Sequence, residues 1–395
     1  MPQFLRTLVA GMNTTTPPVS KQMDCLVVVA NGYRYLFTVR TNSADFVFFK
    51  STDGGLTWNN SISIDTANTP VLYTVWYDRW TNGDTGNLIH IWLADSTIDD
   101  IQYWNLDTST DTLSAPVQVF AGGTLSSSVN TCMSGCKTRG GNLLLLCDPD
   151  AGGEDGFYRS TDGGANWTAR TTTVLESSDY FIILPANVAD NQDADIIWWD
   201  RSASIISLKL YDDSGDAITS ETNIATSMTS IGSTTINPQF SAMTRHSDGH
   251  QILVAWDNRD TGTDDLKCYD INGAASIVTK TDVVTNTDDC NMCALYIDQS
   301  NDHLYVLYAG KSDGSEDIAT GVGVYGKCST DGGTTWGSEF TVTSTLALYD
   351  TLRCNRSGSG PLWQVLYTAA AGDTDFHLYV AVPNPANAAS YQLGI

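Results

Sequence analysis

The chain has 395 residues, with 45 acidic and 20 basic side chains and a formal net charge of −25. Only five of the acidic residues are glutamate, the remainder are aspartate, and there are 33 glycines. Aspartate and glycine favour turns whereas glutamate favours helices, so this composition excludes a mostly helical protein. A hydrophobic content of 42% indicates a globular chain with a core.

The charge and the apolar runs also exclude two classes of partner. A strongly acidic chain without a basic patch repels phosphate backbones, so we expect no nucleic-acid binding. Apolar runs such as Leu26–Ala30 and Leu143–Cys147 are far shorter than the ~18 residues that a membrane span needs. Arg6 interrupts the apolar start of the chain, which therefore lacks a signal-peptide layout. We expect cytoplasmic synthesis, followed by action on a virion or outside the cell.

Nine cysteines cannot all pair within one chain. Cys290-x-x-Cys293 and Cys132-x-x-x-Cys136 each have the spacing of half a zinc site, but none of the five histidines stands at a matching spacing. The sequence therefore favours buried thiols that act as small hydrophobes, in a protein assembled in a reducing cytoplasm.

Read in chain order, the sequence begins with an apolar segment at 4–12 and a linker-like stretch at 14–18. Seven similar units follow, each with an apolar strand, an acidic loop, an alternating strand, a turn and a Thr/Val-rich strand. The units begin near Asp24, Pro70, Ser126, Ser178, Asn237, Asp289 and Leu346. We expect residues 1–20 to supply a closing strand and a linker, and residues 21–395 to form one domain. The outer strand of the last unit would come from the N-terminal segment or from the tail at 391–395.

One motif, which we call the S-T-D-G-G turn, occurs three times and ends each time in Trp. Its Asp accepts backbone N–H groups within a tight turn, Gly supplies the positive φ, and Trp can fold back onto a neighbouring sheet. We expect these residues to be structural: Ser51, Asp53, Gly55 and Trp58; Ser160, Asp162, Gly164 and Trp167; Ser329, Asp331, Gly333 and Trp336.

The spacing of the copies predicts the architecture. Asp53 and Asp162 are 109 residues apart, and Asp162 and Asp331 are 169 apart, which fits two and three repeats of about 55 residues. Degenerate copies without the Trp lie between them, at 103–107, 210–215 and 268–273. Several short strands per repeat predict an all-β propeller with seven blades of about four antiparallel strands, with six blades as the alternative.

With these turns the chain resembles the Asp-box (BNR-repeat) family, whose best-known members are sialidases. The resemblance implies a propeller with these hairpins on one face, but the motif also occurs in non-catalytic propellers, so it does not imply activity. Sialidases use three arginines to clamp the substrate carboxylate, a Tyr nucleophile with a Glu, and an Arg-Ile-Pro signature that this chain lacks. If the chain were such an enzyme, the residues in those roles would be Glu176, Tyr180, Arg40, Arg201 and Arg259.

The loops between second and third strands lie on the face opposite the S-T-D-G-G turns. Trp beside Asp and Arg is the equipment of a sugar site, so we expect ligand binding there, although a Trp repeated at strand ends is also typical of core packing. The predicted ligand-binding residues are Arg40, Trp199, Asp200, Arg201, Trp256, Asp257 and Arg259. Carboxylates in the same loops form either a solvated rim or a weak Ca²⁺ site, for which the candidates are Asp148, Asp150, Glu154 and Asp155.

These observations favour a non-enzymatic recognition or structural module, such as a phage tail, fibre or head-decorating protein that binds a glycan or a partner protein. Multi-copy or oligomeric display would suit weak binding at each site. We expect no cofactor other than Ca²⁺. The alternative is a sialidase-like exo-glycoside hydrolase.

Overall fold

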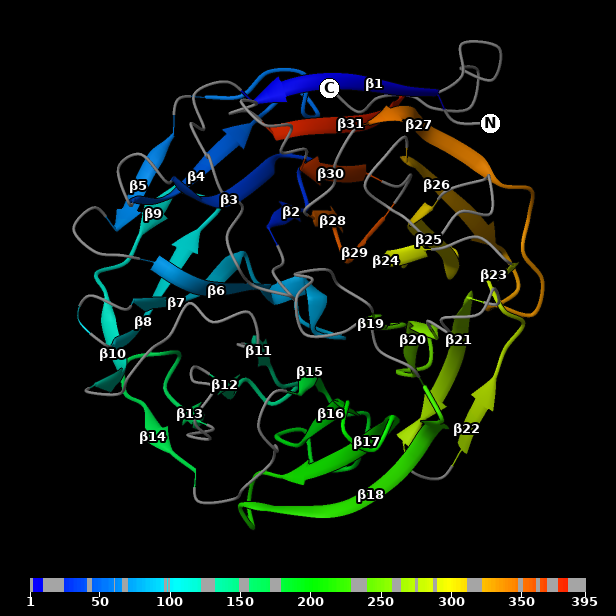
Figure 1. Cartoon of the computed structure of the whole chain (residues 1–395). Helices are drawn as coiled ribbons and strands as arrows, with labels where there is room; N and C mark the ends of the chain where they lie inside the picture. Colours follow the sequence, from blue (N-terminus) through cyan, green and yellow to red (C-terminus); the bar gives the residue numbers. More distant parts are fainter. Residues whose placement is uncertain are drawn as a thin grey trace.

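The computed structural model is a ring of β-sheets around a central axis (Figure 1). It describes residues 3–9, 25–40, 45–59, 61–65, 70–95, 98, 100–121, 132–148, 156–170, 179–228, 240–257, 264–273, 276–286, 290–310, 322–346, 351–359, 363–367 and 376–382. These residues form strands and turns, with one short 3₁₀ segment, η1 (Asp78–Trp80), and no α-helix among them. Within the described ranges, no helix has the length and hydrophobicity that a membrane span requires.

The described strands pair into seven sheets, numbered here in chain order. Sheet 1 contains β2 (Leu26–Val28), β3 (Arg34–Arg40), β4 (Asp45–Ser51) and β5 (Ile62–Asp65). Sheet 2 contains β6 (Pro70–Tyr77), β7 (Leu88–Asp95), β8 (Asp100–Asp107), β9 (Thr112–Leu113) and β10 (Val117–Ala121). Sheet 3 contains β11 (Cys132–Lys137), β12 (Leu143–Asp148), β13 (Gly156–Ser160) and β14 (Thr168–Ala169). Sheet 4 contains β15 (Tyr180–Pro185), β16 (Ala194–Asp200), β17 (Ile205–Asp212) and β18 (Ala217–Thr226).

The other three sheets complete the ring. Sheet 5 contains β19 (Phe240–Thr244), β20 (Gln251–Asp257), β21 (Asp264–Asn272), β22 (Ser276–Thr279) and β23 (Val284–Asn286). Sheet 6 contains β24 (Cys290–Asp298), β25 (His303–Gly310), β26 (Val322–Ser329) and β27 (Phe340–Leu346), and β29 (Ser357–Gly358) pairs with β24 in parallel. Sheet 7 contains β28 (Thr351–Cys354), β30 (Trp363–Tyr367), β31 (Phe376–Val382) and β1 (Gln3–Val9).

The two ends of the described chain meet in sheet 7. Strand β1 pairs antiparallel with β31, with Gln3 opposite Val382 and Val9 opposite Phe376. The N-terminal segment therefore supplies the outer strand of the last unit, one of the two sources that the sequence allows. This pairing closes the ring and removes two exposed sheet edges. The predicted all-β propeller is confirmed, and the seven sheets correspond to the seven units of the repeat.

The core lies between adjacent sheets, because each sheet is covered on both faces by its neighbours. Its largest fully buried side chains are aromatic, and among them are Trp76, Trp92, Trp199 and Trp256. Aromatic rings bridge neighbouring sheets: the ring centroid of Phe240 lies 5.9 Å from that of Trp199. Such burial stabilises the fold by removing large apolar surfaces from water.

The S-T-D-G-G turns join the third and fourth strands of their sheets. In sheet 1, Ser51 Oγ donates to Asp53 Oδ1 (2.8 Å) and accepts from the amide of Gly55 (2.8 Å). Asp53 Oδ1 also accepts from the amide of Thr57 at 2.9 Å, and Thr57 Oγ1 donates to Asp53 Oδ2 at 2.5 Å. Gly55 has φ +88°, which only glycine adopts without strain. The carboxylate thus satisfies the backbone of the turn.

The other two copies have the same geometry. The amide of Gly164 donates to Ser160 Oγ (2.8 Å), and that of Gly333 donates to Ser329 Oγ (2.8 Å). Asp162 Oδ1 accepts from the amide of Asn166 (2.9 Å), as Asp331 Oδ1 does from that of Thr335 (2.9 Å). Hydrogen bonds from Thr335 and Ser329 lower the pKa of Asp331 to about 2.

Two of the tryptophans that end these turns, Trp167 and Trp336, fasten their sheets to the preceding ones. The ring centroid of Trp167 lies 5.4 Å from that of Tyr103 and 6.2 Å from that of Trp92, both in sheet 2. Trp336 Nε1 donates to the carbonyl of Thr281 in sheet 5 at 2.8 Å. Trp58 is partly buried against the core. The motif therefore acts as a structural clasp in sheets 3 and 6.

The side chains of eight cysteines are described; these are thiols, and all but Cys328 are buried. Some of these thiols donate hydrogen bonds to backbone carbonyls of neighbouring sheets: Cys132 Sγ donates to Phe181 O (3.8 Å), and Cys354 Sγ donates to Leu295 O (3.5 Å). Burial raises the pKa of Cys268 to about 12, so this thiol stays protonated. Among the described residues, no group of three metal-ligating side chains occurs. The prediction of buried thiols is confirmed for the seven buried cysteines.

Candidate functional site

The two faces of the ring differ in what closes them. On the face of the S-T-D-G-G turns, the segment that begins with η1 bridges sheets 2 and 5. Asn82 Nδ2 donates to the carbonyl of His246 (2.9 Å), and His246 Nε2 lies 3.2 Å from the carbonyl oxygen of Trp80. Trp80 is buried beneath this bridge. A ligand on the axis would therefore be expected to approach from the opposite face.

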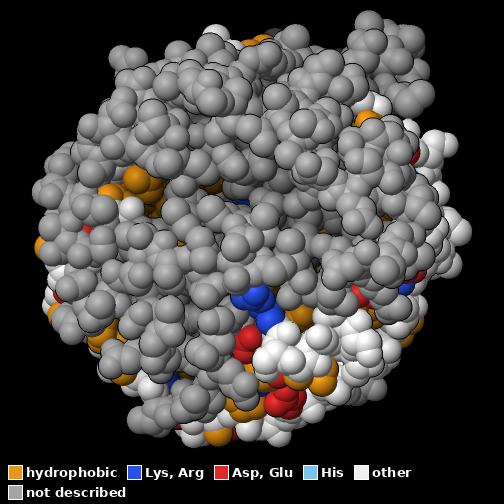
Figure 2. All heavy atoms as spheres, viewed as in Figure 1, with side chains coloured by type: hydrophobic (Ala, Val, Ile, Leu, Met, Phe, Trp, Pro, Cys, Tyr) orange, Lys and Arg blue, Asp and Glu red, His pale blue; other side chains and the backbone are white. Residues whose placement is uncertain are grey.

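That opposite face carries the turns between second and third strands, and we call it the loop face. Much of the surface seen in Figure 2 belongs to residues outside the described ranges, with a few basic and acidic side chains side by side near its centre. The described part of the loop face lies mainly in sheet 4, where the turn 201–204 joins β16 to β17. The predicted residues Asp200 and Arg201 lie there.

Arg201 is a partly exposed cation held above an aromatic ring. Its guanidinium carbon lies 4.8 Å from the ring centroid of Tyr180, and its backbone amide donates to Asp179 Oδ1 (3.1 Å). The other oxygen of Asp179 accepts from Trp198 Nε1 at 3.0 Å. Asp179 is buried, so one carboxylate fixes both the turn and the indole. This arrangement orients a positive charge at the loop face.

Asp200 has a structural role in the same turn. Its Oδ1 accepts from Ser202 Oγ (2.8 Å) and from the amide of Ala203 (2.7 Å). These bonds close the turn that presents Arg201. The two predicted neighbours therefore have different roles: the Asp200 carboxylate stabilises the turn, and the Arg201 guanidinium is placed to contact a ligand.

Tyr180 does not have the features of a nucleophile. Its side chain is 2% exposed, and burial raises its pKa to about 12. An activated nucleophile needs a lowered pKa or an adjacent base, together with access to substrate. Glu176, the predicted partner of Tyr180, lies outside the described residues.

The prediction that Trp199 and Trp256 stack on a sugar needs correction. Both indoles are 0% exposed. Trp199 packs edge-on against Phe240, and Trp256 packs edge-on against Tyr308 with ring centroids 6.4 Å apart. Because both faces of a propeller sheet are covered by neighbouring sheets, a Trp near a strand end is drawn into the core. The core-packing interpretation holds for both residues.

The remaining predicted residues contribute less to the described site. Asp257 ends β20 and is buried. Arg40 ends β3, but the structure does not describe its side chain. The same holds for Asp148 at the end of β12. Outside the described residues lie Arg259, Asp150, Glu154 and Asp155.

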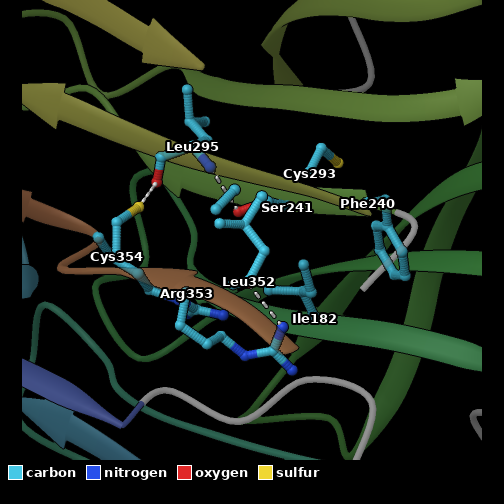
Figure 3. Close-up of a pocket in the computed structure, with 10 residues that line it drawn as sticks. Ile182, Phe240, Ser241, Cys293, Leu295, Leu352, Arg353 and Cys354 are labelled. Carbon is cyan, nitrogen blue, oxygen red and sulfur yellow. Dashed lines mark hydrogen bonds between the residues drawn. The ribbon is translucent and has the colours of Figure 1, made fainter. Parts of the chain in front are cut away.

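The sequence did not single out a cavity where the innermost strands of sheets 4 to 7 meet (Figure 3). Its volume is about 30 Å³, and its lining includes Arg353 and Arg356, both 6% exposed. The remaining lining residues are Ile182, Phe240, Ser241, Cys293, Ala294, Leu295, Leu352 and Cys354. A signal for it exists in the sequence, since two arginines three residues apart occur in the first strand and the following turn of the last unit.

Comparisons with known proteins support the fold. A scan against protein-family models gives no match, and a search of curated proteins gives none. Among solved structures, hydrazine synthase of Kuenenia stuttgartiensis is 8% identical with a TM-score of 0.55, covering 95% of this chain and 98% of that one. The polysaccharide lyase Uly1 is 12% identical with a TM-score of 0.53, covering 97% of this chain and 100% of that one. A leech intramolecular trans-sialidase is 10% identical with a TM-score of 0.51, covering 84% of this chain and 69% of that one. At these identities the likeness shows a shared β-propeller architecture, and fold alone does not select an activity.

Proposed function

We propose that the protein is a non-enzymatic recognition module that binds a glycan or a partner protein at its loop face. The observation that carries this proposal is the oriented cation in sheet 4: Arg201 above the ring of Tyr180, with its turn fixed by Asp179. A guanidinium held in place loses little entropy on binding a carboxylate or hydroxyl group. Two of the similar structures, a polysaccharide lyase and a trans-sialidase, make a carbohydrate a reasonable first ligand class.

The buried Tyr180 favours binding over hydrolysis. A sialidase-like reaction needs a tyrosine that can reach the substrate and lose its proton, whereas burial here raises the pKa to about 12. The absence of an Arg-Ile-Pro segment from the sequence agrees with a non-catalytic member of the Asp-box family. The alternative of an exo-glycoside hydrolase is therefore kept as an outcome of the test.

A loop face with one oriented cation would bind its ligand weakly, so we also propose that the protein is displayed in many copies. Linked sites raise avidity by about 10²–10⁴ without new contacts. A virion surface, such as a phage tail, fibre or head decoration, is one setting that supplies this multiplicity. Mass spectrometry of purified particles, using peptides of this chain, would test that placement.

The binding proposal is tested on a glycan array with multivalent protein. Wild type should bind a subset of glycans, Arg201→Ala should lose that signal, and Arg139→Ala should keep it. Arg139 is the matched control because it is an exposed arginine in the first turn of sheet 3, on the opposite face. Equal glycan binding by wild type and Arg201→Ala would contradict a sugar site at Arg201.

The alternative is tested with a fluorogenic sialoside and a panel of glycosides. The proposal predicts no turnover above buffer. Steady product release that Glu176→Ala or Tyr180→Phe abolishes would establish the hydrolase instead.

A further inference from the structure

The segment 78–87 crosses the axis of the ring, and we call it the axial strap. It leaves β6 of sheet 2 with η1, which Figure 1 draws near the centre of the ring, and it returns to β7. Its tip contacts His246 of sheet 5 through Asn82 and the carbonyl of Trp80. Sheets 3 and 4 separate sheets 2 and 5 along the ring (Figure 1). The strap therefore links two sheets that are not neighbours.

The base of the axial strap is held by a buried histidine. His90 Nε2 lies 3.0 Å from Asp78 Oδ1, and His90 Nδ1 lies 2.7 Å from the hydroxyl oxygen of Tyr103. Burial raises the pKa of Asp78, but hydrogen bonds from His90 and Lys137 outweigh it and hold the pKa at about 2. Because this carboxylate is ionised and accepts, Nε2 carries the proton of the neutral ring and Nδ1 accepts from Tyr103.

A second proton on His90 is disfavoured while the strap is closed. The side chain is 2% exposed, and burial lowers its pKa. The charged groups that face it have both signs: Asp78 and Asp84 of the strap favour the charged ring, whereas Lys137 of β11 disfavours it. Lys137 Nζ lies 2.6 Å from Asp78 Oδ1 and 2.7 Å from Asp84 Oδ2, so it already neutralises part of their charge. His90 therefore gains its second proton more readily when the strap is lifted and water reaches the ring.

The tip of the strap rests on a second histidine in the same protonation state. His246 Nε2 lies 3.2 Å from Trp80 O, and a carbonyl oxygen only accepts, so Nε2 carries the proton. Burial lowers the pKa of His246, against the hydrogen bond to Trp80 and the charge of Asp302. The amide of His246 donates to Gln299 Oε1 of sheet 6 at 2.8 Å. This bond holds the turn of sheet 5 in place, so the strap can lift without unfolding the turn beneath it.

We propose that the axial strap is an acid-sensitive closure of the face of the S-T-D-G-G turns, which is closed at neutral pH and lifts in mild acid, where His90 and His246 take up protons. Lifting breaks the contacts of Asn82 and Trp80 with sheet 5 and exposes the Trp80 indole, which is buried in the closed strap. The strap lies on the face opposite Arg201, so its opening does not depend on glycan binding there.

The sign of the pH dependence follows from linkage. A hydrated histidine titrates near about 6.5, whereas both rings titrate lower in the closed strap. The open state therefore binds more protons below about pH 6.5, and its population rises as the pH falls. The opening constant should increase by about tenfold at most for each histidine and each pH unit below that value.

Hydrogen exchange read by mass spectrometry tests the strap in the full chain. The amides of Thr81, Asp84, Gly86 and Leu88 donate to acceptors within the strap. Their protection factors, which correct for the intrinsic exchange rate, should fall by about tenfold or more between about pH 7 and about pH 5.5. Amides of the turn 329–336 in sheet 6 should keep their protection over this range.

Variants separate the titration from the contact. His246→Gln keeps a donor for the carbonyl of Trp80 and removes one titrating group, so the pH-dependent loss of protection should shrink, as it should in His90→Gln. His303→Gln, which removes a histidine of β25 in sheet 6, should follow wild type. Asn82→Ala removes the bond to the carbonyl of His246, so strap protection should fall by about threefold to tenfold at every pH, with an unchanged pH dependence.

Wild-type data alone decide the question if a variant fails to fold. Strap protection that is the same at about pH 7 and about pH 5.5 would overturn the proposal. An equal loss of protection in the turn 329–336 would mark acid unfolding of the whole ring and would also overturn it. The same holds for equal pH dependence in wild type, His90→Gln and His246→Gln, because groups other than these histidines would then control the strap.

Discussion

Two neighbouring interfaces of the ring are fastened by different chemistry. Between sheets 2 and 3 the fastener is an indole, with Trp167 packed on Tyr103 and Trp92. Between sheets 3 and 4 it is a set of ion pairs, with Arg159 Nη1 2.9 Å from Asp213 Oδ2. In both cases the turn between the third and fourth strands of one sheet reaches back to the preceding sheet.

The ion-pair interface depends on one buried carboxylate. Asp213 Oδ2 accepts from Arg159 Nη1 and also from Asn142 Nδ2 at 3.0 Å, and both donors belong to sheet 3. The Asp213 carbonyl accepts from Arg170 Nη2 at 2.7 Å, and Arg170 Nε lies 3.2 Å from Asp216 Oδ1. Arg170 follows β14, so sheet 3 supplies both arginines of these ion pairs.

The comparison shows how a repeat can degenerate without opening the ring. The turn at 213–216 belongs to a copy that lost its Trp, and arginines from the neighbouring sheet replace the indole contact. The contact therefore stays at the same place in the repeat, while the groups that make it change from an indole to ion pairs. The two interfaces should consequently respond differently to truncation, pH and salt.

Truncating the indole should have the largest effect. Trp167→Ala removes the contacts with Tyr103 and Trp92 and leaves a gap between sheets 2 and 3. A fully buried Trp costs about 3–5 kcal/mol on truncation, and Trp167 is partly buried, so we expect about 3 kcal/mol. Chemical denaturation measures the change.

Trp167→Phe is the matched variant, since it keeps an aromatic ring at the interface and loses the bond from Nε1 to the carbonyl of Gly164. It should cost less than half as much as Trp167→Ala. If both variants unfold like wild type, the indole does not fasten the two sheets.

Removing the buried carboxylate should have the next largest effect. Asp213→Ala leaves Arg159 and Asn142 without their shared acceptor, at about 2 kcal/mol. Asp212→Ala is the control, because Asp212 accepts hydrogen bonds within its own turn, from Ser214 Oγ (2.7 Å) and the amide of Gly215 (3.0 Å). Equal losses of stability in Asp213→Ala and Asp212→Ala would show that the ion pairs between sheets 3 and 4 stabilise the protein no more than the hydrogen bonds within the turn do.

The contrast also explains what could be predicted from the sequence. The three S-T-D-G-G turns predict the fold because their hydrogen bonds are local, within five residues of one another. The degenerate turn at 210–215 is recognisable by position, but its arginine partners lie in another sheet, 54 and 43 residues before Asp213, and no local pattern links them.

The functional residues follow the same rule. The turn that carries Arg201 is predictable because Asp200 closes it locally. Trp199 was misassigned because local sequence does not reveal which neighbouring sheet covers an indole. Arg353 and Arg356 were overlooked because the cavity exists only when strands from four sheets converge.

Acid should weaken the hydrogen-bonded turns of sheets 1, 3 and 6. Slight burial raises the pKa of Asp53, but hydrogen bonds from Thr57 and Ser51 outweigh it and hold the pKa at about 2, as hydrogen bonds also do for Asp331. An unfolded Asp titrates near about 3.9. The stabilisation is therefore present above about pH 3.9 and is lost as the pH falls through about 2.

Melting temperatures between about pH 5 and pH 2 measure this loss. The triple variant Asp53→Asn, Asp162→Asn, Asp331→Asn should start lower and fall less steeply than wild type across this window. Glu221→Gln, an exposed change of one charge on β18, should follow the wild-type slope. Parallel slopes for the triple variant and wild type would show that these carboxylates do not control acid unfolding.

Changes in salt concentration should have the smallest effect. They distinguish the ion pairs between sheets 3 and 4 from the indole contact between sheets 2 and 3. Asp216→Asn removes the ion pair with Arg170 while keeping a side chain that tolerates φ +47° at this position. We expect a cost of about 0.5–1 kcal/mol at about 0.05 M salt that shrinks toward zero at about 0.5 M, because screening weakens partly exposed pairs. The cost of Trp167→Phe should stay constant over the same range, because an aromatic contact is not screened. A cost of Asp216→Asn that does not change with salt would mean that backbone geometry at φ +47°, rather than charge, ties sheet 4 to sheet 3 at this turn.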